Sequence, residues 1–376
     1  MARSFRNLVR EEARELPLYV PGKPIEEVKR KLGLIEVIKL ASNENAWGPS
    51  PLAVKAMQEA LIESNRYPDA NAYDLITALV HSFGLKEEHF LVGNGSDQII
   101  QMLAQTFFRA GDEVLMGKPT FPRYATVTRL MGAIPIEIPC IEGYYPLQQL
   151  LDGITDKTKA IFLCNPNNPT GMVFTEQELR TFVEAVPPNI IIIFDEAYHE
   201  FADYPFSGVD FLSDDRPLLV LRTFSKAFGL AGIRIGFAIG HPDLIEGLNR
   251  VRDPFNASVP ALAGALAAWQ DQDYLNEIIS KNKIERSRLN AALEQLGVSF
   301  FPSQTNFIMA FFKEPANQLS DKLLTEGIIV RPGVGFGYPE GLRITIGTKE
   351  ENDRLLVALE KHLMNNAQCT MHNYEL

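Results

Sequence analysis

Short apolar runs alternate with amphipathic stretches through the middle of this chain of 376 residues. The run at 190–194 is apolar at every position, which is typical of a strand in a parallel sheet whose two faces are covered by helices. Ser50 with Pro51, and a capping box at 175–178, mark the starts of two helices. This alternation predicts an α/β fold with a large doubly wound, mostly parallel sheet. Its expected strands are 90–92, 113–116, 134–138, 160–164, 190–194, 218–221 and 235–239.

The pattern changes after Pro260, where we expect a smaller α+β domain. The N-terminal part of the chain contains Pro17, Pro21 and Pro24, which indicate an extended arm. The predicted division is an N-terminal arm at 1–40 that packs with the small domain, a large domain at 41–260 and the small domain at 261–376. The expected helices of the small domain are 261–269 and 274–296, and its expected strands are 298–301, 306–312 and 342–346.

Composition narrows the class of protein. The net charge of −11 and the pI near 5.2 argue against a nucleic-acid partner. Cys140, Cys164 and Cys369 are far apart and the six histidines lack ligand spacing, so we expect no disulfide framework and no metal site. The N-terminus lacks the apolar core of a secretory signal, and the longest aliphatic run is too short to span a bilayer. We therefore expect a soluble, cytoplasmic protein.

The sequence GNGSD at 93–97 lies between a predicted strand and a predicted helix. Backbone N–H groups at the start of a helix form an anion site, so the backbone at Ser96 and Asp97 is a candidate phosphate site. The alternative is an ordinary glycine turn in which Ser96 or Asp97 caps the helix.

The sequence NPNNPTG at 165–171 ends the expected strand 160–164. Ligands of open α/β sheets collect at the carboxyl ends of strands. Asn168 is therefore a candidate donor to a phenolate oxygen, although for this motif taken alone a plain β-turn is the favoured interpretation.

Asp195 directly follows the apolar run 190–194. A carboxylate there has lost its solvent and needs a partner, for which a pyridinium nitrogen is suitable. With that proton held, the ring becomes an electron sink for carbanion chemistry. Tyr198 could share the ring oxygen with Asn168. The alternative for Asp195 is a helix N-cap.

Lys226 follows the expected strand 218–221 and is preceded by Ser225. Its amine can form a Schiff base with a carbonyl cofactor. Ser225 and Arg234 are placed to bind a phosphate, with Arg234 as a bidentate clamp. Taken singly, Lys226 would be a solvated surface charge and Arg234 half of a surface ion pair. Together with the preceding motifs, these residues predict an enzyme that uses pyridoxal 5'-phosphate.

Arg331 and Arg343 lie beside apolar runs of the small domain. Two arginines in such positions indicate recognition of a carboxylate or phosphate on a substrate. A structural salt bridge is the alternative for each of them alone.

As a set, these motifs resemble the fold-type I pyridoxal phosphate aminotransferases, and among them the histidinol-phosphate aminotransferase family. The resemblance extends from about residue 18 to residue 347, nearly the whole chain. The matching stretches are 18–24, 39–45, 48–51, 66–69, 93–97, 165–171, 195–198, 223–236 and 342–347.

The resemblance implies a role for each matching residue. Lys226 would hold the cofactor and move a proton, and Asp195 would pair with the ring nitrogen. The other cofactor ligands would be Asn168 and Tyr198 at the ring oxygen, Tyr124 stacked on the ring, and Ser96, Asp97, Ser225 and Arg234 at the phosphate.

The resemblance also implies a homodimer with shared active sites, because Tyr67 would reach the cofactor phosphate of the neighbouring subunit. Tyr19 would cover the substrate, and Arg331 and Arg343 would bind its anionic end. The expected reaction is transamination between glutamate and imidazole acetol phosphate, which gives histidinol phosphate and 2-oxoglutarate.

Two departures from the family pattern concern the surroundings of the site rather than its catalytic groups. Ala46-Trp47 replaces a proline followed by an aromatic residue or leucine, and Gln98 replaces a glutamate. The first bears on substrate preference. The alternatives are therefore an aminotransferase for phenylalanine or tyrosine and a decarboxylase of a phosphorylated amino acid on the same fold. A non-enzymatic binding protein is disfavoured, and so is a nicotinamide enzyme, because 93–97 lacks the third glycine of GxGxxG.

Overall fold

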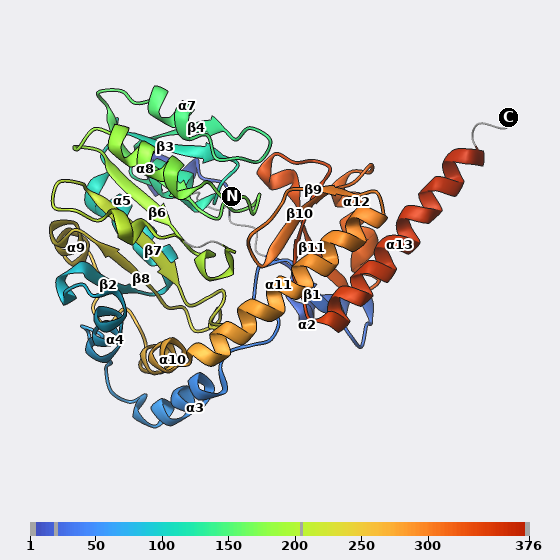
Figure 1. Cartoon of the computed structure of the whole chain (residues 1–376), viewed down its shortest axis with the longest axis horizontal. Helices are drawn as coiled ribbons and strands as arrows, with labels where there is room; N and C mark the ends of the chain where they lie inside the picture. The colour runs from blue at the N-terminus through green and yellow to red at the C-terminus, as the bar shows by residue number, and fades with distance from the viewer. Residues whose placement is uncertain (1–4, 19–21, 204–205, 373–376) are drawn as a thin grey trace.

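The chain folds around two sheets, one of seven strands and one of five. The computed structural model describes residues 5–18, 22–203 and 206–372. Figure 1 shows the seven-stranded sheet and its helices on one side, the five-stranded sheet on the other, and the long helix α11 (Gln272–Gln295) running between them. Among the described residues, no helix is both long enough and apolar enough to cross a membrane.

The large sheet is mostly parallel, with the strand order β2-β8-β7-β6-β5-β3-β4. Only β8 runs antiparallel to its neighbours β7 and β2. The predicted α/β fold is thus confirmed, and each of its expected strands is present. They are β2 (Phe90–Gly93), β3 (Glu113–Lys118), β4 (Ile134–Pro139), β5 (Thr158–Cys164), β6 (Ile191–Asp195), β7 (Leu218–Thr223) and β8 (Gly236–Gly240).

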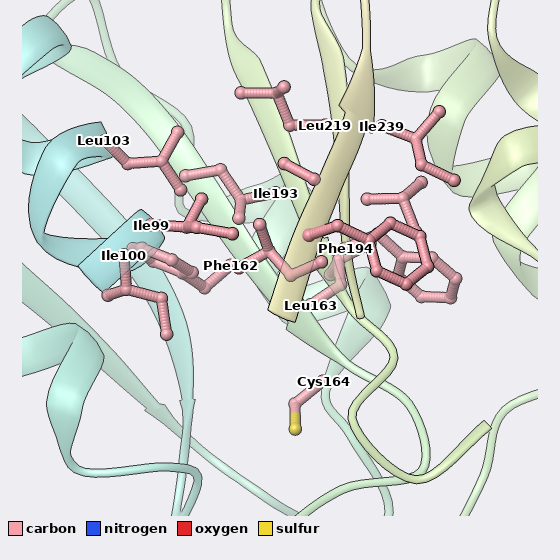
Figure 2. Packing of buried hydrophobic residues seen from close by; sticks show 14 of the residues in the cluster. Ile99, Ile100, Leu103, Phe162, Leu163, Cys164, Ile193, Phe194, Leu219 and Ile239 are labelled. Atoms are coloured by element: carbon pink, nitrogen blue, oxygen red, sulfur yellow. The ribbon is translucent and has the colours of Figure 1, made fainter. Parts of the chain in front are cut away.

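Helix α5 (Gly95–Phe107) packs against this sheet and contacts β2, β8 and β7. Figure 2 shows Ile99, Ile100 and Leu103 of α5 meeting side chains of the central strands, including Phe162 and Ile193. A fully buried side chain of this size stabilises the fold by about 1.5–3 kcal/mol. The other helices that surround the sheet are α3 (Pro51–Ala60), α4 (Tyr73–Phe83), α6 (Arg123–Leu130), α7 (Leu147–Asp152), α8 (Glu176–Ala185), α9 (Pro242–Asn249) and α10 (Val259–Gln270).

The small sheet has the order β1-β11-β12-β10-β9. Three of its strands were expected, whereas β1 (Ile38–Leu40) and β11 (Ile328–Pro332) were not. These two strands pair in parallel over only three residues, and they lie near opposite ends of the sequence. No local sequence pattern therefore predicts them. The remaining elements are β9 (Ser299–Phe300), β10 (Phe307–Phe311), β12 (Gly341–Thr345), α2 (Ile25–Leu32), α12 (Ala316–Thr325) and α13 (Lys349–His372).

The N-terminal arm divides between the two halves of the molecule. Strand β1 joins the small sheet through its pairing with β11. The short helix α1 (Glu11–Arg14) instead contacts α6 of the large half, and the Arg10 guanidinium donates to the carbonyl of Leu130. The predicted boundaries at 40 and 260 stay a prediction.

Candidate active site

The polar motifs meet at one edge of the large sheet. Strands β5, β6 and β7 run parallel, so their carboxyl ends lie side by side, and Cys164 is directly opposite Asp195. Asn168 follows β5, Asp195 ends β6 and Lys226 follows β7. Helix α5 begins near the same edge, after β2. The parallel topology therefore brings together residues that are far apart in the sequence.

Asp195 is a buried carboxylate with only neutral hydrogen-bond donors. Its side chain accepts from the Tyr124 hydroxyl at 2.6 Å and from the backbone N–H of Ala197 at 3.0 Å. No lysine, arginine or histidine among the described residues forms an ion pair with it. Burial consequently raises the pKa of Asp195 to about 6, against the lowering effect of the Tyr124 hydrogen bond. A cation delivered by a ligand would complete this site.

Tyr124 has a different position from the one predicted for it. Its side chain is wholly buried, and its ring lies parallel to that of Phe162 with centroids 4.3 Å apart. Its hydroxyl donates a hydrogen bond to Asp195 and so stabilises that carboxylate. The geometry therefore disfavours stacking of Tyr124 on a cofactor ring. Phe121, three residues earlier and only partly buried, is the better candidate, and the PTF sequence at 119–121 was the signal for it.

Lys226 is partly buried, and two arginines are among its charged neighbours. Its amine donates to the carbonyl of Ser42 at 3.4 Å and lies 5.6 Å from the centre of the Tyr198 ring. The pKa of Lys226 is lowered to about 8, mainly by burial and also by the neighbouring Arg343 and Arg234, whereas Glu44 and Asp97 oppose the lowering. The amine can therefore lose and regain a proton near neutral pH, which a surface lysine does not do.

The start of α5 forms an anion site with Arg234 and Ser225. No side chain caps this helix at Asn94, so its first backbone N–H groups remain available. The Arg234 guanidinium donates to Ser225 Oγ at 3.3 Å and pairs with Asp97 at 3.7 Å. Gly236 is required beside them, because a Cβ there would lie 2.8 Å from the backbone nitrogen of Ser96.

Arg343 extends from the small sheet to the same place. Its guanidinium donates to the Asn168 side-chain oxygen at 2.6 Å and to the Ala41 carbonyl at 2.9 Å, while its Nε is buried without a partner. Burial lowers the pKa of Arg343 to about 10, and Arg331, its neighbour across β11 and β12, contributes to the lowering. Neither arginine forms an ion pair within the described residues, which argues against the salt-bridge alternative and for an external anion.

Tyr198 and Asn43 form a contact that no motif indicated. The Asn43 amide donates to the Tyr198 hydroxyl at 2.8 Å, and Asn43 has a left-handed backbone with φ of 56°. The only available signal was the SNEN sequence at 42–45, because asparagine is common at left-handed positions.

Tyr67 lies apart from the cluster just described. Its side chain is 80% exposed, and its ring stacks on Phe255 with centroids 4.4 Å apart. The neighbouring Asp253 and Asn256 bind the Gln98 side chain, which also accepts from the backbone N–H at position 94. Tyr19 lies outside the described residues. No group of histidine, cysteine, aspartate and glutamate within the described ranges is arranged to hold a metal ion.

The chain belongs to the class I and II aminotransferase family, whose sequence profile matches residues 35–359. Among its curated relatives are histidinol-phosphate aminotransferases: that of Moorella thermoacetica is 41% identical over 94% of this chain and 92% of its own, and that of Geobacillus thermodenitrificans is 41% identical over 96% and 100%. The resemblance predicted from the motifs is confirmed.

Solved structures agree with this family. The histidinol-phosphate aminotransferase of Sinorhizobium meliloti, in complex with pyridoxal-5'-phosphate, superimposes with a TM-score of 0.87 at 28% identity, covering 95% of this chain and 98% of the other. An aspartate aminotransferase of Thermus thermophilus shares the fold, with a TM-score of 0.82 at 22% identity over 95% and 99% of the two chains.

Proposed function

We propose that the protein is a histidinol-phosphate aminotransferase of histidine biosynthesis, which uses pyridoxal 5'-phosphate and exchanges an amino group between glutamate and imidazole acetol phosphate. One observation carries this proposal: Lys226, Asp195 and Arg343 lie together at one edge of the large sheet, and Arg343 has no acidic partner among the described residues. The full-length likeness to enzymes of that name supports the choice of substrate.

The residues present fit the cofactor. Asp195 lacks a cationic partner, which a protonated pyridine nitrogen provides. Two donors also lack acceptors within the described chain: the amide nitrogen of Asn168 and the hydroxyl proton of Tyr198. Both suit the ring oxygen. The uncapped start of α5, with Ser225 and Arg234, suits the phosphate.

The chemistry divides between the cofactor and the protein. Bound pyridoxal phosphate supplies an electron sink for the negative charge that develops on the substrate Cα. Lys226 would hold the cofactor, and once displaced by the substrate amine, its Nζ would take up the proton that leaves the substrate Cα and deliver it to the cofactor carbon on the other side of the amine nitrogen. A pKa of about 8 suits both transfers near neutral pH.

Arg343 and Arg331 bind the anionic end of each substrate. Arg343 already has a hydrogen bond to Asn168, and the rings of Phe307 and Phe336 lie 5.4 and 5.3 Å from its guanidinium carbon. These contacts fix the guanidinium before a substrate arrives, which favours a planar carboxylate or a phosphate. One site thus accepts the glutamate carboxylate in one half-reaction and the phosphate ester in the other.

A single-turnover spectrum tests this proposal. The purified protein should show the absorption of lysine-bound cofactor, and histidinol phosphate should bleach it efficiently whereas phenylalanine should do so poorly. Faster bleaching by phenylalanine would move the assignment to an aromatic aminotransferase, and release of carbon dioxide to a decarboxylase. Absence of the band after added pyridoxal phosphate would contradict the role of Lys226.

We further propose a homodimer with shared active sites. Tyr67, 80% exposed, stacks on the exposed Phe255, and the exposed Ile62 and Tyr73 lie close to Tyr67 in the sequence. Exposed apolar side chains that gather in this way are typical of an interface. Through Asp253 and Asn256, this surface is also connected to Gln98 at the start of α5. These features support an interface at which Tyr67 reaches the partner's phosphate site.

Mixed dimers of two defective proteins test this arrangement. Lys226→Ala subunits are mixed with Tyr67→Ala subunits at limiting cofactor, each being weakly active alone. If Tyr67 serves the neighbouring site, each mixed dimer contains one intact site, and random exchange restores about a quarter of wild-type activity. No recovery on mixing, with exchange verified by mass, would place Tyr67 in its own subunit's site or in neither.

The free thiols of Cys140 and Cys164 also agree with a reducing compartment. On this basis we propose a cytoplasmic location. A fluorescent fusion that fractionates with a periplasmic or membrane marker would contradict it.

A further inference from the structure

Residues 41–48 cross from the small sheet to the large half of the molecule through the candidate active site. On the way, the carbonyls of Ala41 and Ser42 accept hydrogen bonds from Arg343 and Lys226. The carbonyl of Asn43 accepts from the Asn306 amide. This crossing segment therefore touches the substrate-binding arginine, the lysine and both sheets, and its one buried side-chain amide belongs to Asn43.

Asn43 faces the Tyr198 hydroxyl, and the direction of the hydrogen bond between them matters. The Asn43 amide nitrogen donates, because its oxygen is occupied by the hydroxyl of Thr345 at 3.4 Å. The phenolic oxygen of Tyr198 is therefore an acceptor in this bond, and its own proton must point elsewhere. Nothing in the described part of the chain accepts that proton, although the side chain is 3% exposed.

The surroundings keep Tyr198 protonated. Burial raises the pKa of Tyr198, and the nearby Asp195 and Cys164 raise it further, whereas Arg343 and the Asn43 hydrogen bond lower it. Lys226 lies beside its ring. The raising effects dominate, so the hydroxyl keeps its proton and is a donor near neutral pH.

Asn43 is itself held by the small sheet. Its backbone N–H donates to Thr345 Oγ at 2.9 Å, in addition to the side-chain contact with the same hydroxyl. Thr345 lies two residues after Arg343 on β12, so both side chains are on one face of the sheet. A single strand thus supplies the anion-binding arginine and the anchor of Asn43.

We propose that Asn43 is a positioning residue, which fixes the Tyr198 hydroxyl so that its proton points at the ring oxygen of the cofactor. This inference rests on the proposed function, in which Tyr198 binds that oxygen. Asn43 occupies one side of the phenolic oxygen of Tyr198. The Tyr198 proton therefore finds an acceptor only on the opposite side, where the ring oxygen of the cofactor would lie.

A simpler explanation is that Asn43 is present for its backbone alone, because asparagine tolerates a φ of 56° better than most residues. Asn43→Asp separates the two explanations. Aspartate has nearly the same shape and also tolerates the left-handed region, but it cannot donate to Tyr198 and instead accepts its proton. Asn43→Gly keeps the backbone and removes the side chain, and serves if the aspartate variant does not fold.

The experiment is a pH titration of the absorption of the bound cofactor in Asn43→Asp, Tyr198→Phe and the double variant. A donor to the ring oxygen lowers the basicity of that oxygen, so its loss should raise the pH of the spectral change. We expect a rise of about one pH unit in each single variant and no further rise in the double variant. Asn45→Asp is the matched control, since its amide nitrogen donates to the carbonyls of Gly48 and Ala227 and its oxygen accepts from the Trp47 N–H, so it has no hydrogen bond to Tyr198. Its effect should add fully to that of Tyr198→Phe.

The outcomes separate this inference from the proposed function. If Tyr198→Phe shifts the titration and Asn43→Asp does not, the role of Asn43 is refuted but that of Tyr198 stands. The same conclusion follows if Asn43→Asp causes an equal shift in the wild-type protein and in Tyr198→Phe. An unshifted Tyr198→Phe would refute the proposed role of Tyr198 and the inference with it. A protein without cofactor absorption would refute the proposed function.

Discussion

Lys226→Ala protein is expected to lose transamination by roughly 10⁴-fold or more, while it still binds pyridoxal phosphate noncovalently. On the proposed mechanism, the substitution removes both the group that holds the cofactor and the group that moves the Cα proton. Binding should survive, because Asp195, Asn168 and the anion site at α5 do not depend on the lysine. Turnover of glutamate with imidazole acetol phosphate measures the loss, and equilibrium dialysis measures the cofactor retained.

A matched control makes this result specific. Lys55 is a solvent-exposed lysine on α3, paired with Glu59, and it is not part of the candidate active site. Lys55→Ala should retain full activity, since an exposed pair of this kind contributes at most about 1 kcal/mol to stability. Borohydride reduction of the wild-type protein should attach the cofactor at Lys226 alone. The proposed mechanism would be excluded if Lys226→Ala retained turnover, or if reduction attached the cofactor to another lysine.

The fold was predictable where its signals are local. All of β6 before Asp195 is apolar because both faces of the strand are buried, and the capping box at Thr175 forms as expected. Strands β1 and β11 were missed, since their pairing is decided by residues about 290 positions apart in the sequence and each strand is short. Local periodicity has no information about such contacts.

The candidate site, like the fold, was predictable where its signals are local in the sequence and not where they depend on long-range contacts. Asp195 and Lys226 were identifiable because a charged residue directly after a buried strand requires an explanation, and the structure gives both of them shifted pKa values. The role of Tyr124 was misjudged, because its motif does not reveal that Phe162 covers the ring and Asp195 takes the hydroxyl. Asn43 could not be inferred, since its partner Tyr198 lies in the turn after β6 of the large sheet and its partner Thr345 lies on β12 of the small sheet. In each case the missing information was a tertiary contact.

Asp195→Asn is expected to lower kcat/KM by about 10²–10³-fold and to weaken cofactor binding. The asparagine keeps the shape of the side chain and an acceptor for the Tyr124 hydroxyl, but it has no charge to hold a proton on the ring nitrogen. Steady-state kinetics at saturating cofactor measure the first effect. Lys55→Ala again serves as the control, and an Asn variant with wild-type kcat/KM would remove Asp195 from the mechanism.

The pH dependence of cofactor affinity isolates this charge. In the apoprotein burial raises the pKa of Asp195 to about 6, so the carboxyl is neutral below that pH and cannot pair with a cationic ring nitrogen. The affinity of the wild-type apoprotein should therefore fall below pH 6 by up to about tenfold per pH unit. The cofactor phosphate titrates in the same range, but it does so equally in Asp195→Asn, so the difference between the two proteins reports Asp195 alone.

The same carboxylate has opposite effects on the stability of the two forms of the enzyme. Its pKa is higher in the folded apoprotein than in the unfolded chain, so ionisation opposes folding once the pH rises above the unfolded value near 4, and the full cost is present above pH 6. At pH 8 the Asn apoprotein should then melt at a higher temperature than wild type. With cofactor bound the order should reverse, because the carboxylate now has its cationic partner and tight binding stabilises only the folded state. Thermal melts of both proteins with and without pyridoxal phosphate check this, and an unchanged order would mean that the ring nitrogen is not the partner that Asp195 lacks.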